Sequence, residues 1–316
     1  MFRLLAVLFL VLSFGFFYYF SASEENSLVS PIGKVFGVSG QKVPVNTWFP
    51  KEPKDVNVPY NLSLGAKSAL LVDFDSGEIL FEKNASQKLP AASTIKIMTA
   101  LVALENKKPS DSFTVSENAA KIGENSMGLT AGENLTLEEL LYGLMLVSGN
   151  DAAVTIAEGI AGTEEAFVSL MNQKAVELGL SGTKFINASG LDQDGKQQYT
   201  TAYDMAIIAR YVWEKYPVFG KITSTEHKYI DFEFGHKSYD LYNDTNLLTT
   251  YPGVKGIKPG FTWEAGLCLV TYAENEGKRL LGVILGSDDR RGEMKELLDF
   301  GFATYGIYVS HPALDL

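Results

Sequence analysis

The sequence predicts a mixed α/β fold of the α+β type, in which an antiparallel sheet is flanked by helices and contains a helical insertion region. Three observations support this prediction. Two short apolar runs within residues 66–84 flank a turn signal. Helical patterns then fill most of residues 88–216, and strand-like runs return after residue 227. The order of these segments indicates one sheet that is built from both ends of the chain.

The first strands are predicted on either side of Asp75-Ser76-Gly77, because small and turn-forming residues between apolar runs are typical of a hairpin. A buried helix follows within residues 88–106 and is opened by Ser93. The next helix covers residues 135–147, where Thr136 and Glu139 form a capping box.

Two further helices are predicted at residues 162–180 and 201–216. Thr163 is a suitable N-cap for the first of these, and Gly179 lies near its end. The later elements are strand-like segments at residues 227–234, 266–274 and 279–287 and a closing helix at residues 292–305.

The N-terminus carries an unbroken apolar run from Leu4 to Phe20, preceded by the single cation Arg3. Such a segment is an export signal or a membrane anchor rather than part of the fold, and the bulky residues before the weak cleavage site favour the anchor. We therefore expect residues 1–23 to be a signal or anchor, 24–60 a tether, and 61–316 one folded domain. The domain is expected to lie outside the cytoplasm, in the cell envelope, and to contact the membrane through residues 4–20.

Composition excludes several classes of function. The 316 residues carry a formal charge of -11, which argues against non-specific nucleic-acid binding and against a basic membrane-binding patch. The single cysteine, Cys268, lies in an apolar run and is expected to be a small core residue. The three histidines show no metal-ligand spacing, so no metal or cofactor is predicted.

The segment Ser93-Thr94-Ile95-Lys96 is the candidate for chemistry. Residues i and i+3 share one face of a helix, so Ser93 and Lys96 are expected to point the same way. A buried lysine has a lowered pKa and can accept the proton of a serine hydroxyl, while the N–H groups at a helix start can stabilise an oxyanion. Two other Ser-x-x-Lys segments occur in the chain, but only this one opens an apolar helix. Taken alone, this segment is better explained by a serine that caps the helix and a lysine whose charged end reaches solvent.

Two companion segments strengthen the catalytic interpretation. Ser148-Gly149-Asn150 separates two apolar helices, where Ser148 would relay a proton and Asn150 would hold Lys96 and a substrate amide. Further along, Lys258 and Gly260 begin a strand, where the lysine would bind a carboxylate and the glycine would let a substrate backbone approach closely. The alternatives are an ordinary turn between helices and an exposed lysine at a sheet edge.

Together, these residues resemble the penicillin-binding protein and serine β-lactamase superfamily, whose marks are Ser-x-x-Lys, Ser-x-Asn and Lys-Thr-Gly in this order. Within it, the chain is similar to the low-molecular-mass D-alanyl-D-alanine carboxypeptidases from about residue 60 to 306. The supporting segments are SMGLTAGE, LLYGLMLVSGNDAA, NASGLD, TTAYDMAIIARY and GVKGIKPGFTWEAGLCLV. The resemblance implies the DD-peptidase and β-lactamase fold, peptidoglycan stem peptides as substrate and β-lactams as inhibitors.

The resemblance also implies roles for individual residues. Ser93 attacks the peptide carbonyl between two D-alanines to form an acyl-enzyme, and Lys96 acts as the general base. Ser148 and Asn150 complete the proton network.

A second set of residues is implied to bind the substrate. Lys258 and Arg290 lie near the terminal carboxylate, and the N–H groups of Ser93 and Phe261 form the oxyanion hole. Water then releases the acyl group, so no cofactor is required.

One departure from the family pattern concerns the third motif, which is Lys258-Pro259-Gly260 here. Proline has neither a hydroxyl nor an N–H, so the expected hydroxyl contact with the substrate carboxylate is missing. Thr262 replaces it only if a bulge or twist intervenes, because residues 259 and 262 face opposite sides of a regular strand. A proline on a strand also predicts that this strand lies at a sheet edge.

Two alternatives to a carboxypeptidase remain open. A β-lactamase of class A would carry a Glu-x-x-Leu-Asn segment, and the nearest candidate, residues 167–172, has no glutamate in place. A peptidase-like protein that binds peptidoglycan without cleaving it is the other alternative, and Pro259 motivates it. Endopeptidase and transpeptidase activities are variants of the first interpretation.

Overall fold

A computed structural model describes residues 49–51, 62–193, 195–245 and 247–312 of the protein. The predicted anchor and almost all of the predicted tether lie outside these residues, so the proposed domain boundaries stay predictions. Within the described ranges, no helix is both long and apolar enough to cross a membrane. Pro50, inside the predicted tether, accepts a hydrogen bond from the Tyr203 hydroxyl at 2.9 Å, so this short piece packs on the folded domain.

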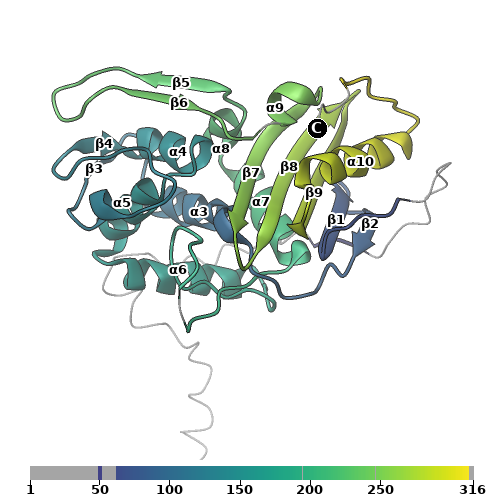
Figure 1. Cartoon of the computed structure of the whole chain (residues 1–316), viewed down its shortest axis with the longest axis horizontal. Coiled ribbons are helices and arrows are strands. Elements are labelled where there is room, and N and C mark those ends of the chain that lie inside the picture. The colour runs from purple at the N-terminus through teal and green to yellow at the C-terminus, as the bar shows by residue number, and fades with distance from the viewer. Residues whose placement is uncertain (1–48, 52–61, 194, 246, 313–316) are drawn as a thin grey trace, which may run out of the picture. The chain divides into compact units, whose positions relative to one another are not determined.

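The main sheet has five strands in the order β2-β1-β9-β8-β7, and all neighbouring pairs are antiparallel. The strands are β1 (Ser68–Asp73), β2 (Ile79–Lys83), β7 (Val254–Thr262), β8 (Gly266–Asn275) and β9 (Lys278–Ser287). Strands from the two ends of the chain meet where β1 pairs with β9 (Figure 1). The predicted antiparallel sheet from both chain ends is therefore confirmed.

The turn between β1 and β2 explains why the first hairpin could be predicted from the sequence. The Asp73 carboxylate accepts hydrogen bonds from the backbone N–H groups of Asp75 and Ser76. Gly77 follows with φ 79°, a left-handed conformation that glycine adopts without a steric cost. These local bonds reverse the chain and fix the pairing of the two strands.

Helices cover both faces of the sheet. Helix α10 (Arg290–Ala303) lies on one face, across β8 and β9 (Figure 1), and α7 (Ala202–Lys215) packs on the other. Apolar side chains from α10 and the strands form a continuous buried core between them, which includes Leu71, Leu280, Met294, Leu297 and Leu298. Burial of these side chains holds the sheet in place as the support for the site.

The helical insertion lies between β2 and β7 in the sequence. Its elements are η1 (Ala92–Ile95), α3 (Lys96–Asn106), η2 (Ala119–Lys121), α4 (Leu137–Leu146), α5 (Asn150–Ala161), α6 (Glu164–Glu177), α7, α8 (Pro217–Thr223) and α9 (Leu247–Thr250). Thr136 and Glu139 form the predicted capping box of α4, and Thr163 caps α6 as predicted. The cap of α7, Thr201, accepts from the Asp204 N–H in the same way.

Two small hairpins complete the fold. They pair β3 (Ser112–Thr114) with β4 (Asn134–Thr136) and β5 (His227–Ile230) with β6 (Tyr239–Tyr242). The strand predicted at residues 227–234 is thus shorter than expected and does not join the main sheet. Its partner β6 alternates between buried and exposed residues and packs against α4 of the helical region.

Strand β7 is an edge strand, as Pro259 predicted. Pro259 sits opposite Leu269 of β8, and β7 lies against η1. Proline has no N–H to donate, and within the described residues β7 has no neighbouring strand on its outer side that would need such a donor. The contact with η1 places β7 next to the start of α3, because η1 directly precedes α3 in the chain.

Candidate active site

Ser93 and Lys96 lie at the junction of η1 and α3, where the chain changes from a 3₁₀ to an α-helix. Lys96 Nζ is 3.0 Å from Ser93 Oγ, so the two side chains point the same way. Ser93 is half-buried, whereas the Lys96 side chain is fully buried. A half-buried hydroxyl beside a buried amine is accessible to a ligand and has a potential proton acceptor within hydrogen-bond distance.

Lys96 has two further partners, and both are acceptors. Its Nζ donates to Asn150 Oδ1 at 2.7 Å and to the Ser189 carbonyl at 2.6 Å. The Asn150 amide is oriented by its own Nδ2, which donates to the Gly123 carbonyl at 3.0 Å. A neutral amine has two N–H donors and one lone pair, so the two acceptors use the donors and the lone pair faces the Ser93 hydroxyl.

The surroundings of Lys96 favour this neutral form. Burial lowers the pKa of Lys96 well below its usual value, and the positive charge of Lys258 lowers it further. The acidic groups Asp244, Asp151 and Glu124 act in the opposite direction. Burial dominates, so the neutral form of Lys96, which can accept a proton, is favoured relative to that of an exposed lysine.

A tight loop carries the Ser189 carbonyl to Lys96. Asn187 accepts from the Gly190 N–H at 2.7 Å and donates to the Leu191 carbonyl at 2.8 Å, which closes the turn. Gly190 has φ 90°, and a Cβ there would lie 2.2 Å from the Ala92 carbonyl oxygen. Only glycine fits at this position, so the segment NASG places a backbone carbonyl directly beside the helix that begins at Lys96.

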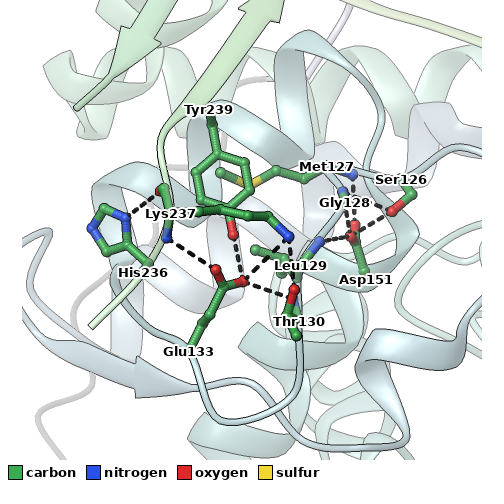
Figure 2. A network of polar contacts seen from close by, with 10 residues as sticks. All are labelled: Ser126, Met127, Gly128, Leu129, Thr130, Glu133, Asp151, His236, Lys237 and Tyr239. Atoms are coloured by element: carbon green, nitrogen blue, oxygen red, sulfur yellow. Dashed lines mark hydrogen bonds and ion pairs between the residues drawn. The ribbon is translucent and has the colours of Figure 1, made fainter. Parts of the chain in front are cut away.

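The start of α5 is fixed by Asp151, the residue after Asn150. Its buried carboxylate accepts hydrogen bonds from the Ser126 hydroxyl at 2.6 Å and from the N–H groups of Met127, Gly128 and Leu129, each at 2.9 Å (Figure 2). These charge-assisted bonds tie the loop at residues 126–129 to the helix that presents Asn150. The position of Asn150 therefore depends on a separate, buried network.

The same loop is tied to the β5–β6 hairpin through Glu133. Its carboxylate accepts from the Tyr239 hydroxyl at 2.6 Å and from the Lys237 N–H at 3.0 Å (Figure 2). Lys237 Nζ also donates to the Thr130 hydroxyl at 2.7 Å. Hydrogen bonds from Tyr239 and Lys237 lower the pKa of Glu133 despite its partial burial, so this carboxylate stays charged.

Ser148 lies in the turn between α4 and α5, two residues before Asn150. It is buried, and its backbone has φ 59°, a conformation that is costly for any residue except glycine. Such strain is found where the surroundings impose it, commonly at functional sites. The ordinary-turn interpretation gives no reason for serine at this position.

Gly260 in β7 lies directly against the backbone at Ser93 and Thr94. A Cβ on Gly260 would be 2.9 Å from the backbone nitrogen of Ser93 and 3.0 Å from that of Thr94. The sequence predicted that the missing side chain lets a substrate backbone approach closely, and this role stays a prediction. The structure gives a further reason for glycine, because a Cβ at residue 260 would meet the backbone of η1.

Two cations lie on either side of Gly260. Lys258 Nζ is fully buried and 3.2 Å from both carboxylate oxygens of Asp244. Arg290, the first residue of α10, donates from Nη1 to the Gly260 carbonyl at 2.6 Å. The predicted alternative of an exposed edge lysine is therefore wrong for Lys258.

The residues after Gly260 alternate in exposure. Phe261 is 47% exposed and Trp263 is 93% exposed, with their rings edge to face and 5.5 Å apart. Thr262 is buried between them, and its hydroxyl accepts from the Ala265 N–H at 3.1 Å. Thr262 thus stabilises the β7–β8 turn. Its proposed contact with the substrate, in place of the family threonine that Pro259 replaces, stays a prediction.

Cys268 is fully buried in β8, as expected of a core residue. Burial raises the pKa of its thiol to about 11, so it has no reactive thiolate at neutral pH. Within the residues that the structure describes, no group of three or more His, Cys, Asp and Glu side chains is arranged to hold a metal ion.

Comparison with known proteins decides the family. The D-alanyl-D-alanine carboxypeptidase family model matches residues 53–289. The chain belongs to this family. It is 42% identical over 248 residues to the D-alanyl-D-alanine carboxypeptidase DacF of Bacillus subtilis, which covers 76% of this chain and 63% of that protein. The chain thus spans less than two thirds of the length of this relative.

Solved structures of similar proteins agree with the family assignment. The D-alanyl-D-alanine carboxypeptidase DacD of Francisella tularensis superposes with a TM-score of 0.71 at 30% identity, covering 84% of this chain and 76% of that chain. Penicillin-binding protein D2 of Listeria monocytogenes, in its ampicillin-bound form, gives a TM-score of 0.68 at 29% identity, covering 77% and 100%. The predicted resemblance and fold class are confirmed.

Three residues of this family member's site were not identified from the sequence. Ser189 acts through its backbone carbonyl, and its only signal was its place in the quoted segment NASGLD. Asp151 lay next to Asn150 in the segment around SGND and was not assigned a role. Asp244 gave no signal, because an acidic residue in a polar loop has no pattern that points to a distant lysine.

Proposed function

We propose that this family member is a serine-type D-Ala-D-Ala carboxypeptidase that removes the terminal D-alanine from peptidoglycan stem peptides. The observation that carries the proposal is the set of contacts around Lys96. Two fixed acceptors and the Ser93 hydroxyl lie within hydrogen-bond distance of a buried amine, and when that amine is neutral its lone pair faces the Ser93 hydroxyl. This is the arrangement that activation of a serine by a neutral lysine requires.

The first half of the reaction forms an acyl-enzyme. The Ser93 hydroxyl gives its proton to Lys96 while its oxygen bonds to the carbonyl carbon between the two D-alanines. The tetrahedral intermediate then expels the amine of the terminal D-alanine. That amine takes back the proton from Lys96 by way of Ser148, so Lys96 returns to its neutral form. Asn150 holds Lys96 in place and contacts the substrate amide.

The charge of the intermediate needs donors on its oxygen. The N–H groups of Ser93 and Phe261 are proposed for this role. The absence of a side chain on Gly260 supports it, because β7 lies in contact with the backbone at Ser93. Fixed backbone donors of this kind stabilise an oxyanion by several kcal/mol, typically about 3.

The substrate's C-terminal carboxylate is proposed to bind beside Lys258, with Arg290 contributing positive charge from α10. Both groups are more than half buried, which strengthens their interaction with an anion. Gly260 and Phe261 would lie along the bound peptide. In the second half of the reaction, water bonds to the acyl carbon and gives a proton to Lys96. The bond from that carbon to Ser93 Oγ then breaks, and Oγ takes the proton from Lys96, so the shortened peptide leaves as a carboxylic acid and both residues return to their starting forms.

The site of action follows from the substrate. We infer that the protein works outside the cytoplasm on the cell wall, held to the membrane by residues 4–20. β-Lactams are proposed to acylate Ser93 and inhibit the enzyme, and the similarity to a structure in its ampicillin-bound form supports this. Ser93, Lys96, Ser148 and Asn150 supply the chemistry without a cofactor.

The proposal is tested by D-alanine release from a diacyl-D-Ala-D-Ala peptide. The wild type is expected to release D-alanine, and Ser93→Ala is expected to release none above the uncatalysed rate. Release that survives in Ser93→Ala would contradict the proposal. Binding of the peptide without any release by the wild type would support a peptidoglycan-binding protein, and rapid multiple turnover of penicillin would support a β-lactamase.

A further inference from the structure

Asp244 is the acidic partner of Lys258. Both of its carboxylate oxygens lie 3.2 Å from Lys258 Nζ, and its side chain is 35% exposed, whereas that of Lys258 is fully buried. The partly exposed carboxylate therefore sits on the solvent side of a buried ammonium group.

The backbone around Asp244 is anchored at two places. The Asp244 N–H donates to the carbonyl of Leu146, two residues before Ser148, at 2.9 Å. Next to it, the Asn243 amide donates to the carbonyls of Thr223 and Thr225 at 3.1 and 2.9 Å. Asp244 is thus held between the end of α4 and the end of α8, so its carboxylate has a defined position relative to β7.

Lys258 depends on this partner for its charge. Burial lowers the pKa of Lys258, the ion pair with Asp244 raises it, and the positive charge of Arg290 lowers it. The charged or titratable groups that face Lys258 are Asp244 from the segment before α9, Arg290 from α10 and Lys96 from α3. Asp244 is the only anion among these three, so it alone offsets the cost of burying the ammonium group.

Other features of this chain increase the importance of that charge. Pro259 supplies no hydroxyl to a substrate carboxylate. Arg290 already donates a hydrogen bond to the Gly260 carbonyl. Recognition of a carboxylate at this site therefore falls mainly on the Lys258 ammonium group.

We propose that Asp244 is a positioning residue that holds the Lys258 ammonium charged and aimed along β7, and so sets the preference for amides whose leaving amine carries a free carboxylate. The inference rests on the proposed function, because it assigns Asp244 a part in the same reaction. It also distinguishes the two fully buried lysines of the site by their hydrogen-bond partners. Lys258 lies beside a carboxylate, whereas Lys96 donates to the neutral acceptors Asn150 and Ser189.

The test compares two peptides over a range of pH: diacyl-D-Ala-D-Ala and the same peptide with a C-terminal carboxamide. The wild type is expected to prefer the free carboxylate. In Asp244→Asn, kcat/KM for the carboxylate peptide is expected to fall about tenfold or more relative to the carboxamide at neutral pH, because Lys258 loses its charge. The preference for the carboxylate peptide requires a charged Lys258, so it is present at low pH and is lost as the pH rises through the pKa of Lys258. Because the mutation lowers this pKa, the variant is expected to lose the preference at a lower pH than the wild type.

Three further variants complete the experiment. Asp244→Glu keeps the charge and is expected to restore most of the preference, and Asp244→Ser removes the charge with a smaller side chain in case the asparagine variant does not fold. Asp231→Asn removes an exposed acid from the β5–β6 hairpin and is expected to behave as the wild type. Thermal unfolding of each variant confirms that it is folded.

Several results would overturn the inference. An equal loss for both peptides with an unchanged pH profile would show a structural role only. A stronger preference for the carboxylate in Asp244→Asn would show that Asp244 competes with the substrate. A wild type that cleaves neither peptide would overturn the proposed function and this inference with it, so the two failures are distinguishable.

Discussion

A side chain at residue 260 would begin 2.9 Å from the backbone nitrogen of Ser93, closer than any real Cβ approaches another atom. Strand β7 and the start of α3 are therefore in backbone contact at the point where the acyl-enzyme is proposed to form. Both proposed oxyanion donors belong to these two segments. The spacing between them is set by the absence of one methyl group.

Gly260→Ala should separate β7 from η1 by a few tenths of an ångström and misplace the oxyanion donors. We expect the rate of acylation by a fluorescent penicillin to fall about 100-fold, the size of effect seen when one such donor is lost. Gly220→Ala in α8 is the matched control, because its Cβ would make ordinary contacts with Trp213 at 3.4 Å and beyond. Equal rates for both variants and the wild type would contradict the proposed contact.

Asn150→Asp should place a carboxylate 2.7 Å from Lys96 Nζ, where Asn150 Oδ1 now lies. An anion at this distance raises the pKa of Lys96, so a larger fraction of the lysine is protonated at a given pH. Acylation is then expected to be about tenfold or more slower at pH 7 and to recover as the pH rises.

The pH dependence of the acylation rate distinguishes this effect from simple misfolding. The rising limb should lie at higher pH in Asn150→Asp than in the wild type. Asn118→Asp adds the same charge at an exposed position and should leave the profile unchanged. A profile in Asn150→Asp that only loses amplitude would argue that Lys96 is not the base.

Asp151→Asn should destabilise the protein more than a surface substitution. Asp151 accepts hydrogen bonds from backbone N–H groups through both carboxylate oxygens. In Asp151→Asn, an NH₂ group replaces one of these oxygens, so the N–H groups that bonded to it lose their acceptor. We expect the free energy of unfolding to fall by about 2–4 kcal/mol. Glu117→Gln, which breaks an exposed ion pair with Lys121, should change it by less than about 0.5 kcal/mol. Urea unfolding measures both, and similar values for the two variants would refute the role of Asp151 in holding the loop.

Pro259→Thr should improve recognition of a substrate carboxylate by restoring a hydroxyl in the third motif. One added hydrogen bond to a charged carboxylate corresponds to a gain of roughly 10–100-fold in kcat/KM. Pro259→Val has nearly the shape of threonine without the hydroxyl and serves as the control. If the two variants are equal in D-alanine release, the hydroxyl is not used at this position.

The sequence predicted the parts of the site that depend on local spacing. Ser93 and Lys96 are three residues apart at the start of a helix, and helical geometry alone brings them together. The edge position of β7 followed from Pro259, because proline is not tolerated inside a sheet. The capping residues Thr136 and Thr163 likewise act within one turn of their own helices.

The parts that were not predicted depend on contacts between distant segments. Asp244 meets Lys258 only because the residues before α9 are tied to the ends of α4 and α8. Ser189 contributes a backbone carbonyl, which leaves no mark in the side-chain pattern. The contact of Gly260 with the backbone of Ser93, more than 160 positions earlier in the chain, was not predicted either. Local patterns carry no information on such partners.

The most direct test of the central claim is the intact mass of the protein after incubation with benzylpenicillin, with Ser93→Ala treated in parallel. Activation of Ser93 by Lys96 predicts one penicilloyl group on the wild type, located on the peptide that contains Ser93, and none on the variant. An adduct of equal amount on Ser93→Ala would contradict the claim. A wild type that neither carries an adduct nor consumes the drug would contradict it as well.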